Sequence, residues 1–426
     1  MAGDLINGDI PNHWEFTTLG EVCKRGGGNI QTGPFGSQLH ASDYVPVGVP
    51  SVMPTNIGEN RIVEDGIVRI TEDDANRLGQ HRLRAGDIIY SRRGDVEKRA
   101  LIREREEGWF CGTGCLKVRL GTGVVDPLFA SLFLGHPAIR EWIVRHAVGA
   151  TMPNLNTTIM SAVPFALPPL AEQKAIASVL GALDDKIELN RRMNATLEAM
   201  ARALFQSWFV DFDPIRAKLD GTMPVGMDAD TAALFPAAFQ DSPIGPIPHR
   251  WEVGRLDDIL TLQRGFDLPT PDRTHGKYPV MAASGPNGCH DKFMVQGPGV
   301  TTGRSGVLGR VFFIHGDFWP LNTSLWVKEF KRVSPAYAFH LMRGLDFEMF
   351  NAGSAVPTLN RNHVHNLSVV MPPKQIVQAF DAQVMPMMKQ QKANEDQSRT
   401  LATLRDTLLP KLLSGELSMA GATDKL

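Results

Sequence analysis

Two long segments of the sequence place apolar residues at the spacing of a helix that packs along another helix. The first spans 169–213 and has no proline between Leu170 and Phe209. Alternating steps of three and four residues from Ile176 reach ten positions, seven of them apolar. Such a stripe is typical of a helix whose seam is buried against a second helix. The predicted seam residues are Leu183, Asn190, Leu197 and Leu204.

The second segment, 373–417, shows the same spacing less regularly, with five of ten seam positions apolar. Its predicted seam residues are Asn394, Leu401, Leu404 and Leu408. Pro386 lacks a backbone N–H and clashes with the preceding turn, so it is expected to kink or interrupt this helix.

Ahead of each helical segment, short runs rich in β-forming residues alternate with turn residues. Examples are GDIIYS, CLKVRL, GVTTG and TSLWVK, and helical stretches follow near 127–148 and 335–350. Each region is therefore expected to be an α+β domain. The predicted organisation is a first domain over 1–168, a helix over 169–213, a linker over 214–246, a second domain over 247–372, a helix over 373–417 and a tail over 418–426.

The two halves of the chain repeat each other. IPNHWEFTTLGEV at 10–22 matches IPHRWEVGRLDDI at 247–259, at an offset of 237. GATMPNLNTTIMSAVPFALPP at 149–169 matches GSAVPTLNRNHVHNLSVVMPP at 353–373, at an offset of 204 that continues into the helices. The variable stretch between these matches is therefore 33 residues longer in the first half. Within it, IIYSRRGDV at 88–96 weakly resembles VTTGRSGVL at 300–308.

A duplicated chain with two seams suggests halves related by a pseudo-two-fold axis and helices that pack antiparallel. Asn190 and Asn394 take equivalent places midway along the seams. Buried there, they would fix the register of the helix pair at some cost in stability. The alternative is that both asparagines face water.

Composition narrows the class of protein. The 426 residues carry a formal net charge of −2, so no global basic field indicates nucleic acid. Four cysteines fit a reducing compartment, and no apolar run approaches the roughly 18 residues of a membrane span. We therefore expect a cytoplasmic protein without a membrane partner.

The sequence lacks several catalytic signatures. No GxxxxGK[ST] phosphate loop, no GxGxxG that opens a βαβ unit and no [DNS]PP[YFW] tetrapeptide occurs. We expect no catalytic residues and no metal site, since Cys111 and Cys115 lack further ligands nearby. Two alternatives stay open: a self-sufficient metal-dependent nuclease using Asp317, Glu329 and Lys331, or an interaction scaffold that does not bind DNA.

Basic charge gathers locally in loops. Between His81 and Arg105, eight Arg and Lys residues face four Asp and Glu residues. Arginine beside glycine and serine suits phosphate contact or bidentate reading of guanine, and asparagine or threonine in loops suits base edges. The predicted DNA-binding residues are Ser37, Gln38, Arg92, Arg93, Asn154, Asn156, Arg304, Ser305, Arg310, Thr358 and Asn360.

Several of these motifs together resemble one family. The IPxxWExxxL openings, GPFGS, GDIIYSRRG, LNTSLWVK and above all PPLAEQKAIASVLGALDDKIELN are similar to the specificity subunit of Type I restriction-modification enzymes. The resemblance implies two target recognition domains, each reading half of a bipartite DNA site, and two helices that act as a ruler. It implies docking of two modification subunits, which carry S-adenosylmethionine, and of restriction or motor subunits. ATP and magnesium are expected in those partners, and no cofactor in this chain.

Overall fold

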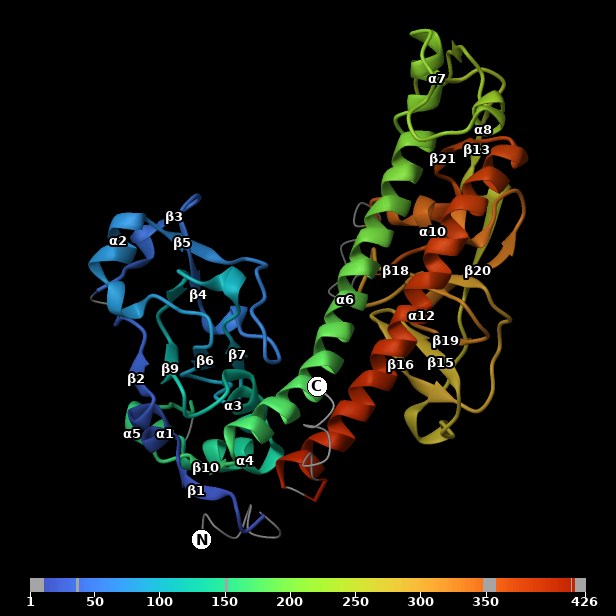
Figure 1. Ribbon diagram of the computed structural model, residues 1–426. Helices are drawn as coiled ribbons and strands as arrows, with labels where there is room; N and C mark the ends of the chain where they lie inside the picture. Colours follow the sequence, from blue (N-terminus) through green and yellow to red (C-terminus); the bar gives the residue numbers. More distant parts are fainter. Residues whose placement is uncertain (1–10, 36–37, 150–151, 348–357, 415, 418–426) are drawn as a thin grey trace. The chain divides into compact units, whose positions relative to one another are not determined.

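The fold is a pair of α+β units joined by two long helices (Figure 1). The computed structural model describes residues 11–35, 38–149, 152–347, 358–414 and 416–417. The first unit contains the chain up to Leu189 together with the segment from Asp396 onward, and the second contains Asn190–Glu395. Each unit therefore holds half of both long helices, α6 (Leu170–Phe209) and α12 (Lys374–Leu413).

The first unit is built on two four-stranded sheets and a strand pair. The sheets have the orders β2-β9-β6-β7 and β3-β5-β4-β8, and β1 pairs with β10. The strands are β1 (Glu15–Thr18), β2 (Gly27–Thr32), β3 (Tyr44–Val45), β4 (Val49–Val52), β5 (Val68–Ile70), β6 (Ile88–Ser91), β7 (Arg99–Leu101), β8 (Phe110–Cys111), β9 (Cys115–Gly121) and β10 (Pro164–Leu167). The short helices are α1 (Leu19–Arg25), α2 (Glu72–Arg77), α3 (Pro127–Phe133), α4 (Pro137–His146) and α5 (Thr157–Ser161).

The second unit repeats this plan. Its sheets have the orders β14-β20-β17-β18 and β16-β15-β19, and β13 pairs with β21. The strands are β13 (Glu252–Arg255), β14 (Leu260–Arg264), β15 (Tyr278–Ala282), β16 (Gly285–His290), β17 (Gly299–Gly303), β18 (Val311–Ile314), β19 (Trp319–Pro320), β20 (Ser324–Phe330) and β21 (Ser368–Met371). The short helices are α9 (Leu256–Ile259), α10 (Pro335–Arg343) and α11 (Arg361–His365). The predicted fold class, two similar α+β domains with a long helix pair, is confirmed.

The IPxxWE motif anchors each domain through its tryptophan. Trp14 is 7% exposed, and its indole N–H donates to the Glu172 carboxylate in the first turn of α6 at 3.1 Å. Trp251 is 2% exposed and its ring lies 6.1 Å from that of Phe209 at the end of α6. The repeated motif is therefore explained by packing of each domain on a long helix.

The long helices run antiparallel. In the first unit Asp184 of α6 forms an ion pair with Arg405 of α12 at 2.8 Å. In the second unit Asn194 donates to the carbonyl of Gln391 at 3.1 Å, and the Phe205 and Phe380 rings lie 5.8 Å apart. Residue numbers along α12 thus fall as those along α6 rise.

The seam follows a longer period than the sequence pattern predicted. Ile187, Ala201 and Phe205 are buried, whereas Met193 and Met200, on the predicted stripe, are 36% and 49% exposed. Leu404 is wrong as a seam residue: it is 45% exposed, and Arg405 faces α6 instead. A straight helix drifts from a 3.5-residue stripe by about 20° per heptad, which accounts for the shift. Leu183, Leu197, Leu204, Leu401 and Leu408 are half-buried, and Asn190 and Asn394 are 1% and 4% exposed.

α12 continues through Pro386, so the predicted interruption is wrong. The proline ring removes the hydrogen bond to the carbonyl of Ala382, and both residues lie on the exposed side of the helix. Val384 and Met388, on either side in sequence, are buried in the core of the second unit. Water can satisfy the carbonyl while packing holds the helix.

The segment predicted as a linker is part of the second unit's core. It forms α7 (Asp213–Leu219), α8 (Ala229–Ala233) and β11 (Phe239–Gln240), which pairs with β12 (Ile247–Pro248). Ile215 and Phe235 are 0% and 2% exposed, and Phe235 packs edge-on against Trp208 of α6. Its low periodicity reflects short elements that each bury one or two residues.

Candidate nucleic-acid interface

In the first unit, the loop after β6 is joined to the loop before α5. The carbonyl of Arg92 accepts a hydrogen bond from Leu155 N at 2.9 Å, and Arg93 pairs with Asn154 as an isolated β-bridge. Gly94, at φ +75°, turns the chain and donates to the carbonyl of Pro153 at 3.1 Å. Predicted DNA-binding residues from two distant segments therefore lie together.

The second unit contains the same junction. The carbonyl of Arg304 accepts from Leu359 N at 2.8 Å, and Ser305 pairs with Thr358. Gly306, at φ +88°, takes the place of Gly94. Leu155 and Leu359 are 0% and 1% exposed, so the leucine of each PxLN motif anchors its loop in the core. We call each of these junctions a paired-loop site: Arg92–Gly94 with 153–156, and Arg304–Gly306 with 358–360.

Arg92 is held in place but keeps its charge. Its Nε donates to the carbonyl of Leu155 at 3.2 Å and to the side-chain oxygen of Asn154 at 3.3 Å. The guanidinium carbon lies 5.7 Å from the centre of the Phe35 ring, which is 56% exposed. Partial burial and the neighbouring Arg93 lower the pKa of Arg92, which nevertheless stays a cation at neutral pH.

Most other cations of the basic segment are already used. Arg82 pairs with Glu72, Lys98 with Asp95, Arg103 with Asp185 and Arg105 with Glu106. Arg99 is 8% exposed and donates to the carbonyl of Ser131. Among the described residues, Arg92 and Arg93 form no ion pair, which leaves their charge for an anionic partner.

The second paired-loop site carries an amide and a carboxylate beside its arginine. Nη1 of Arg304 lies 3.5 Å from the carbonyl of Asn322, whose side-chain amide donates to Asp267. Arg264 lies 3.8 Å from the same carboxylate. Asp267 and Asn322 were not predicted. The LNTS motif and the backbone bond of Gly265 to Ser324, which repeats that of Gly33 to Cys115, are the signals that could have identified them.

Several predicted residues have local structural roles. The side-chain oxygens of Asn156 and Asn360 cap α5 and α11, accepting from Ile159 N and Asn362 N. Gln38 accepts from Phe35 N at 3.1 Å. Ser37 lies outside the described residues. Arg310 is placed elsewhere, with its guanidinium 5.5 Å from the centre of the Phe312 ring.

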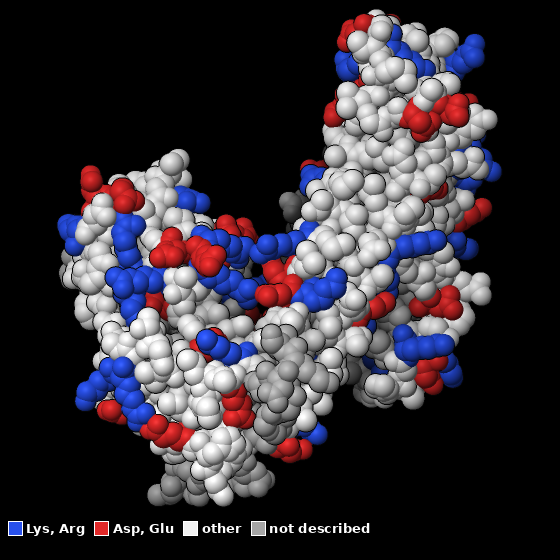
Figure 2. Space-filling model, viewed as in Figure 1, with Lys and Arg blue, Asp and Glu red and all other residues white. Residues whose placement is uncertain are grey.

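The surface carries mixed charge. On the face that Figure 2 shows, each unit has basic side chains interleaved with acidic ones over a largely uncharged surface. The cations on this face are therefore scattered rather than gathered in one broad basic field.

The nuclease alternative finds little support in the described residues. Asp317 accepts from Gly297 N at 3.1 Å, and the Lys331 ammonium lies 3.5 Å from the Asp257 carboxylate. Within the described ranges no three His, Cys, Asp or Glu side chains gather as metal ligands. No helix in the described part is long and apolar enough to cross a membrane.

Known proteins match this chain in both of its repeated halves. The type I restriction modification DNA specificity domain matches residues 11–199 and again residues 248–397. The Type I restriction enzyme MjaIX specificity subunit of Methanocaldococcus jannaschii is 24% identical over 444 residues, covering 96% of this chain and 95% of the relative. The HindI specificity subunit of Haemophilus influenzae is also 24% identical, over 86% of this chain and 95% of its own length.

A solved structure shares the fold. The crystal structure of the Type-I restriction-modification system S subunit from M. genitalium aligns with a TM-score of 0.63 at 17% identity, covering 95% of this chain and 97% of that one. The family model matches most of the sequence in two copies, one per half. The chain therefore belongs to the family of Type I restriction-modification DNA specificity subunits.

Proposed function

We propose that this chain reads an asymmetric, bipartite DNA site, with one half-site read at each paired-loop site. The observation that carries the proposal is the repetition of one backbone junction with different side chains. The first site presents Arg92, Arg93 and Asn154, and the second presents Arg304, Ser305 and Thr358. One scaffold with two sets of side chains suits two different half-sites.

The chemistry of each set fits base recognition. Arginine reads guanine through two parallel hydrogen bonds, asparagine reads adenine, and a carboxylate accepts from the amino group of cytosine. Asp267 beside Arg304 therefore suits a second half-site that presents both a guanine and an amino-bearing base. Ser305 and Thr358 can reach either a phosphate or a base edge.

The long helices would set the spacing between half-sites. Each has 40 residues, which corresponds to about 60 Å at the usual rise per residue. They would also dock the modification subunits, one per half, with restriction or motor subunits joining the assembly. In this proposal S-adenosylmethionine, ATP and magnesium belong to those partners, this chain is non-catalytic, and the complex acts on DNA in the cytoplasm.

The small number of arginines at the paired-loop sites fits shared DNA binding. Salt-dependent affinity grows with the number of phosphates that Lys and Arg neutralise. Arg92 and Arg93 at the first site and Arg304 at the second would neutralise few phosphates, so the partners would supply the rest of that affinity.

Methylome sequencing of the native strain and of a deletion strain tests the proposal. Deletion should remove one bipartite N6-methyladenine motif, and expression of the chain from a plasmid should restore it. Persistence of every methylated motif in the deletion strain would refute the proposed function. The purified chain should also cleave no DNA with magnesium alone, which separates this function from the nuclease alternative.

A further inference from the structure

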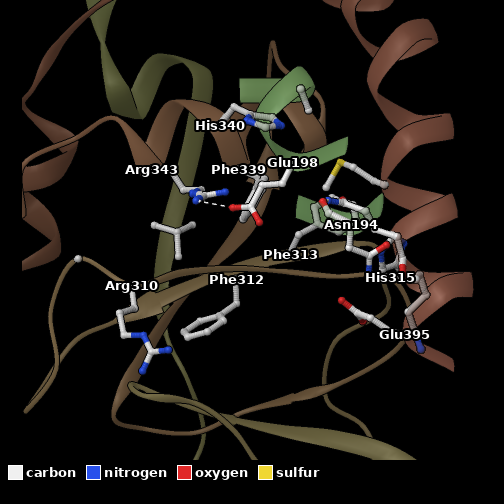
Figure 3. A pocket seen from close by; sticks show the side chains of 16 residues that line it. Asn194, Glu198, Arg310, Phe312, Phe313, His315, Phe339, His340, Arg343 and Glu395 are labelled. Atoms are coloured by element: carbon white, nitrogen blue, oxygen red, sulfur yellow. Dashed lines mark hydrogen bonds and ion pairs between the residues drawn. The ribbon is translucent and has the colours of Figure 1, made fainter. Parts of the chain in front are cut away.

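A groove in the second unit lies between the strand β18, the helix α10 and the long helices (Figure 3). Its volume is about 740 Å³. The strand side supplies Arg310, Phe312 and Phe313, and α10 supplies Phe339 and His340. Asn194 and Met388 are among the residues that the long helices contribute.

The strand along this groove is the last strand of its sheet. In the order β14-β20-β17-β18, β18 pairs on one side with β17 only. Within the described ranges, no other backbone group forms a hydrogen bond with Val311–Ile314. A sheet edge of this kind is a template for pairing with another extended segment.

In the first unit, a segment of the chain itself pairs with the equivalent edge strand. There β7 is the corresponding last strand, and Asn60 pairs with Ala100 in parallel, its N–H donating to the carbonyl of Arg99 at 3.1 Å. The Asn60 side chain also bonds to Ser131, and Glu59 lies 3.8 Å from Arg405. The cavity left beside this covered edge is about 320 Å³.

The second unit has no described counterpart of this covering segment. In the first unit the segment lies in the long connection from β4 to β6. The corresponding connection, from β15 to β17, is shorter and forms β16, which pairs with β15. The groove beside β18 is therefore larger than the cavity beside β7, where Glu59–Asn60 lies along the edge strand of the first unit.

The charged residues that line the groove are Arg310, Arg343, Lys392, Glu198 and Glu395, and Arg310 is the one that favours an acidic occupant. Arg343 is neutralised by Glu198 at 2.7 Å, whereas Arg310 lies against the Phe312 ring and forms no ion pair among the described residues. Phe312, Phe313 and Phe339 offer apolar contact. His340 is 6% exposed, and its Nε2 has no hydrogen-bond partner in the described part of the chain. A buried polar atom of this kind is stabilised by a ligand that bonds to it.

We propose that this groove binds an extended, acidic segment of a partner subunit, which adds to the free edge of β18 as Glu59–Asn60 adds to β7. A carboxylate of that segment would meet Arg310, and an apolar side chain would pack on Phe312 and Phe339. The inference rests on the proposed function in one respect: the partner is taken to be a subunit of the proposed restriction-modification complex. DNA is the competing occupant, and a groove filled by the chain itself is the other alternative.

Photo-crosslinking identifies the occupant. Phe312 is replaced by p-benzoylphenylalanine in the full chain, which is assembled with purified modification subunits, once without DNA and once with added DNA. The expected product is a crosslink to one Asp- or Glu-containing peptide of a partner, mapped by mass spectrometry. Crosslinks only within this chain, only to added DNA, or to nothing would overturn the proposal.

Charge reversal tests the chemistry. Arg310→Glu should weaken assembly without DNA by about tenfold, measured by sedimentation. Arg332→Glu is the matched control, because Arg332 lies in the same unit and pairs with Glu252 at 2.8 Å outside the groove. Equal assembly of the two variants would count against the groove. The methylated motif should keep its sequence in both, so failure here stays distinct from failure of the proposed function.

Discussion

The side-chain amide of Asn190 donates a hydrogen bond of 3.3 Å to the backbone carbonyl of Asn394, across the pair of long helices in the second unit. Asn394 in turn donates to the side-chain oxygen of Asn194 at 2.8 Å and accepts from Gln390 at 2.8 Å. A layer of amide side chains therefore crosses the seam. Such layers favour one register over its neighbours, because any slip buries these groups without partners.

Replacing Asn394 with leucine should destabilise the protein by about 1–3 kcal/mol, because Asn194 and Gln390 then lose a buried partner. Urea unfolding followed by circular dichroism measures the change. Leu404→Ala is the control: Leu404 is 45% exposed, so its truncation should stay within about 0.5 kcal/mol. Similar losses in both variants would show that the polar layer has no special role.

Arg304→Ala should relax recognition of one half-site only. A bidentate contact to guanine is worth about 1–3 kcal/mol of discrimination, so methylation should spread to sites altered in that half. Methylome sequencing reads both halves at once. Equal weakening for all sequences, with no change in motif, would identify Arg304 as a phosphate contact instead.

Asp267→Ala should change the preference at a single position of the same half-site. The Asp267 carboxylate accepts a hydrogen bond from the Asn322 amide and lies near Arg264. Without it, only these two hydrogen-bond donors remain, and neither can accept a hydrogen bond from a base amino group. We expect discrimination at that position to fall by about 1–3 kcal/mol. Binding to a panel of duplexes that differ at one base pair provides the measurement, and an unchanged panel would exclude a base contact.

Gly135→Ala should destabilise the first unit by about 1–3 kcal/mol through overpacking. A Cβ at this position would overlap the guanidinium of Arg99, which is 8% exposed and donates from Nε to the carbonyl of Ser131 at 2.6 Å, so the added methyl must displace this buried hydrogen bond. Thermal unfolding reports the loss. Gly79→Ala provides the comparison, since no atom lies within 4 Å of its added Cβ.

Acid should destabilise the fold between about pH 6.5 and pH 4. Burial lowers the pKa of His81 and of His340 from 6.5 to about 4, so both are neutral in the folded protein above pH 4. The unfolded chain binds protons at these histidines from pH 6.5 downward, which favours unfolding as the pH falls. Urea titrations give the free energy of unfolding at pH 7.5 and at pH 5. Between these two pH values, His340→Phe should lose less of that free energy than the native chain loses. An unchanged difference would exclude this histidine as a contributor.

The duplication and the long helices were predictable because they rest on repeated local patterns. Ile176 and Asn190 lie in the buried seam as the spacing indicated, whereas Met193 and Met200 do not. The error arises from the helical period, since a strict three-four alternation turns away from the seam over 40 residues.

The candidate site was only half predictable. Arg92 and Arg304 stood out because glycine and basic residues surround both in the sequence. Asn156 and Asn360 have side chains suited to reading bases, but they cap helices instead. That role depends on where each helix begins. Asp267 and Phe35 lie in loops without similarity between the halves, and their nearness to the arginines comes from sheet pairing that sequence spacing does not reveal.

The first unit closes its core with the last helical turns of the chain. Leu412 and Leu413 are 1% and 2% exposed among residues such as Trp14 and Leu180 of the amino-terminal half. A ribosome that has completed the first domain must still translate more than two hundred residues before these leucines emerge. At about 5–20 residues per second this takes on the order of ten seconds or more. During synthesis the apolar surface that Leu412 and Leu413 cover therefore stays exposed on the nascent domain. A message truncated near its 3′ end would yield a chain in which this surface is never covered.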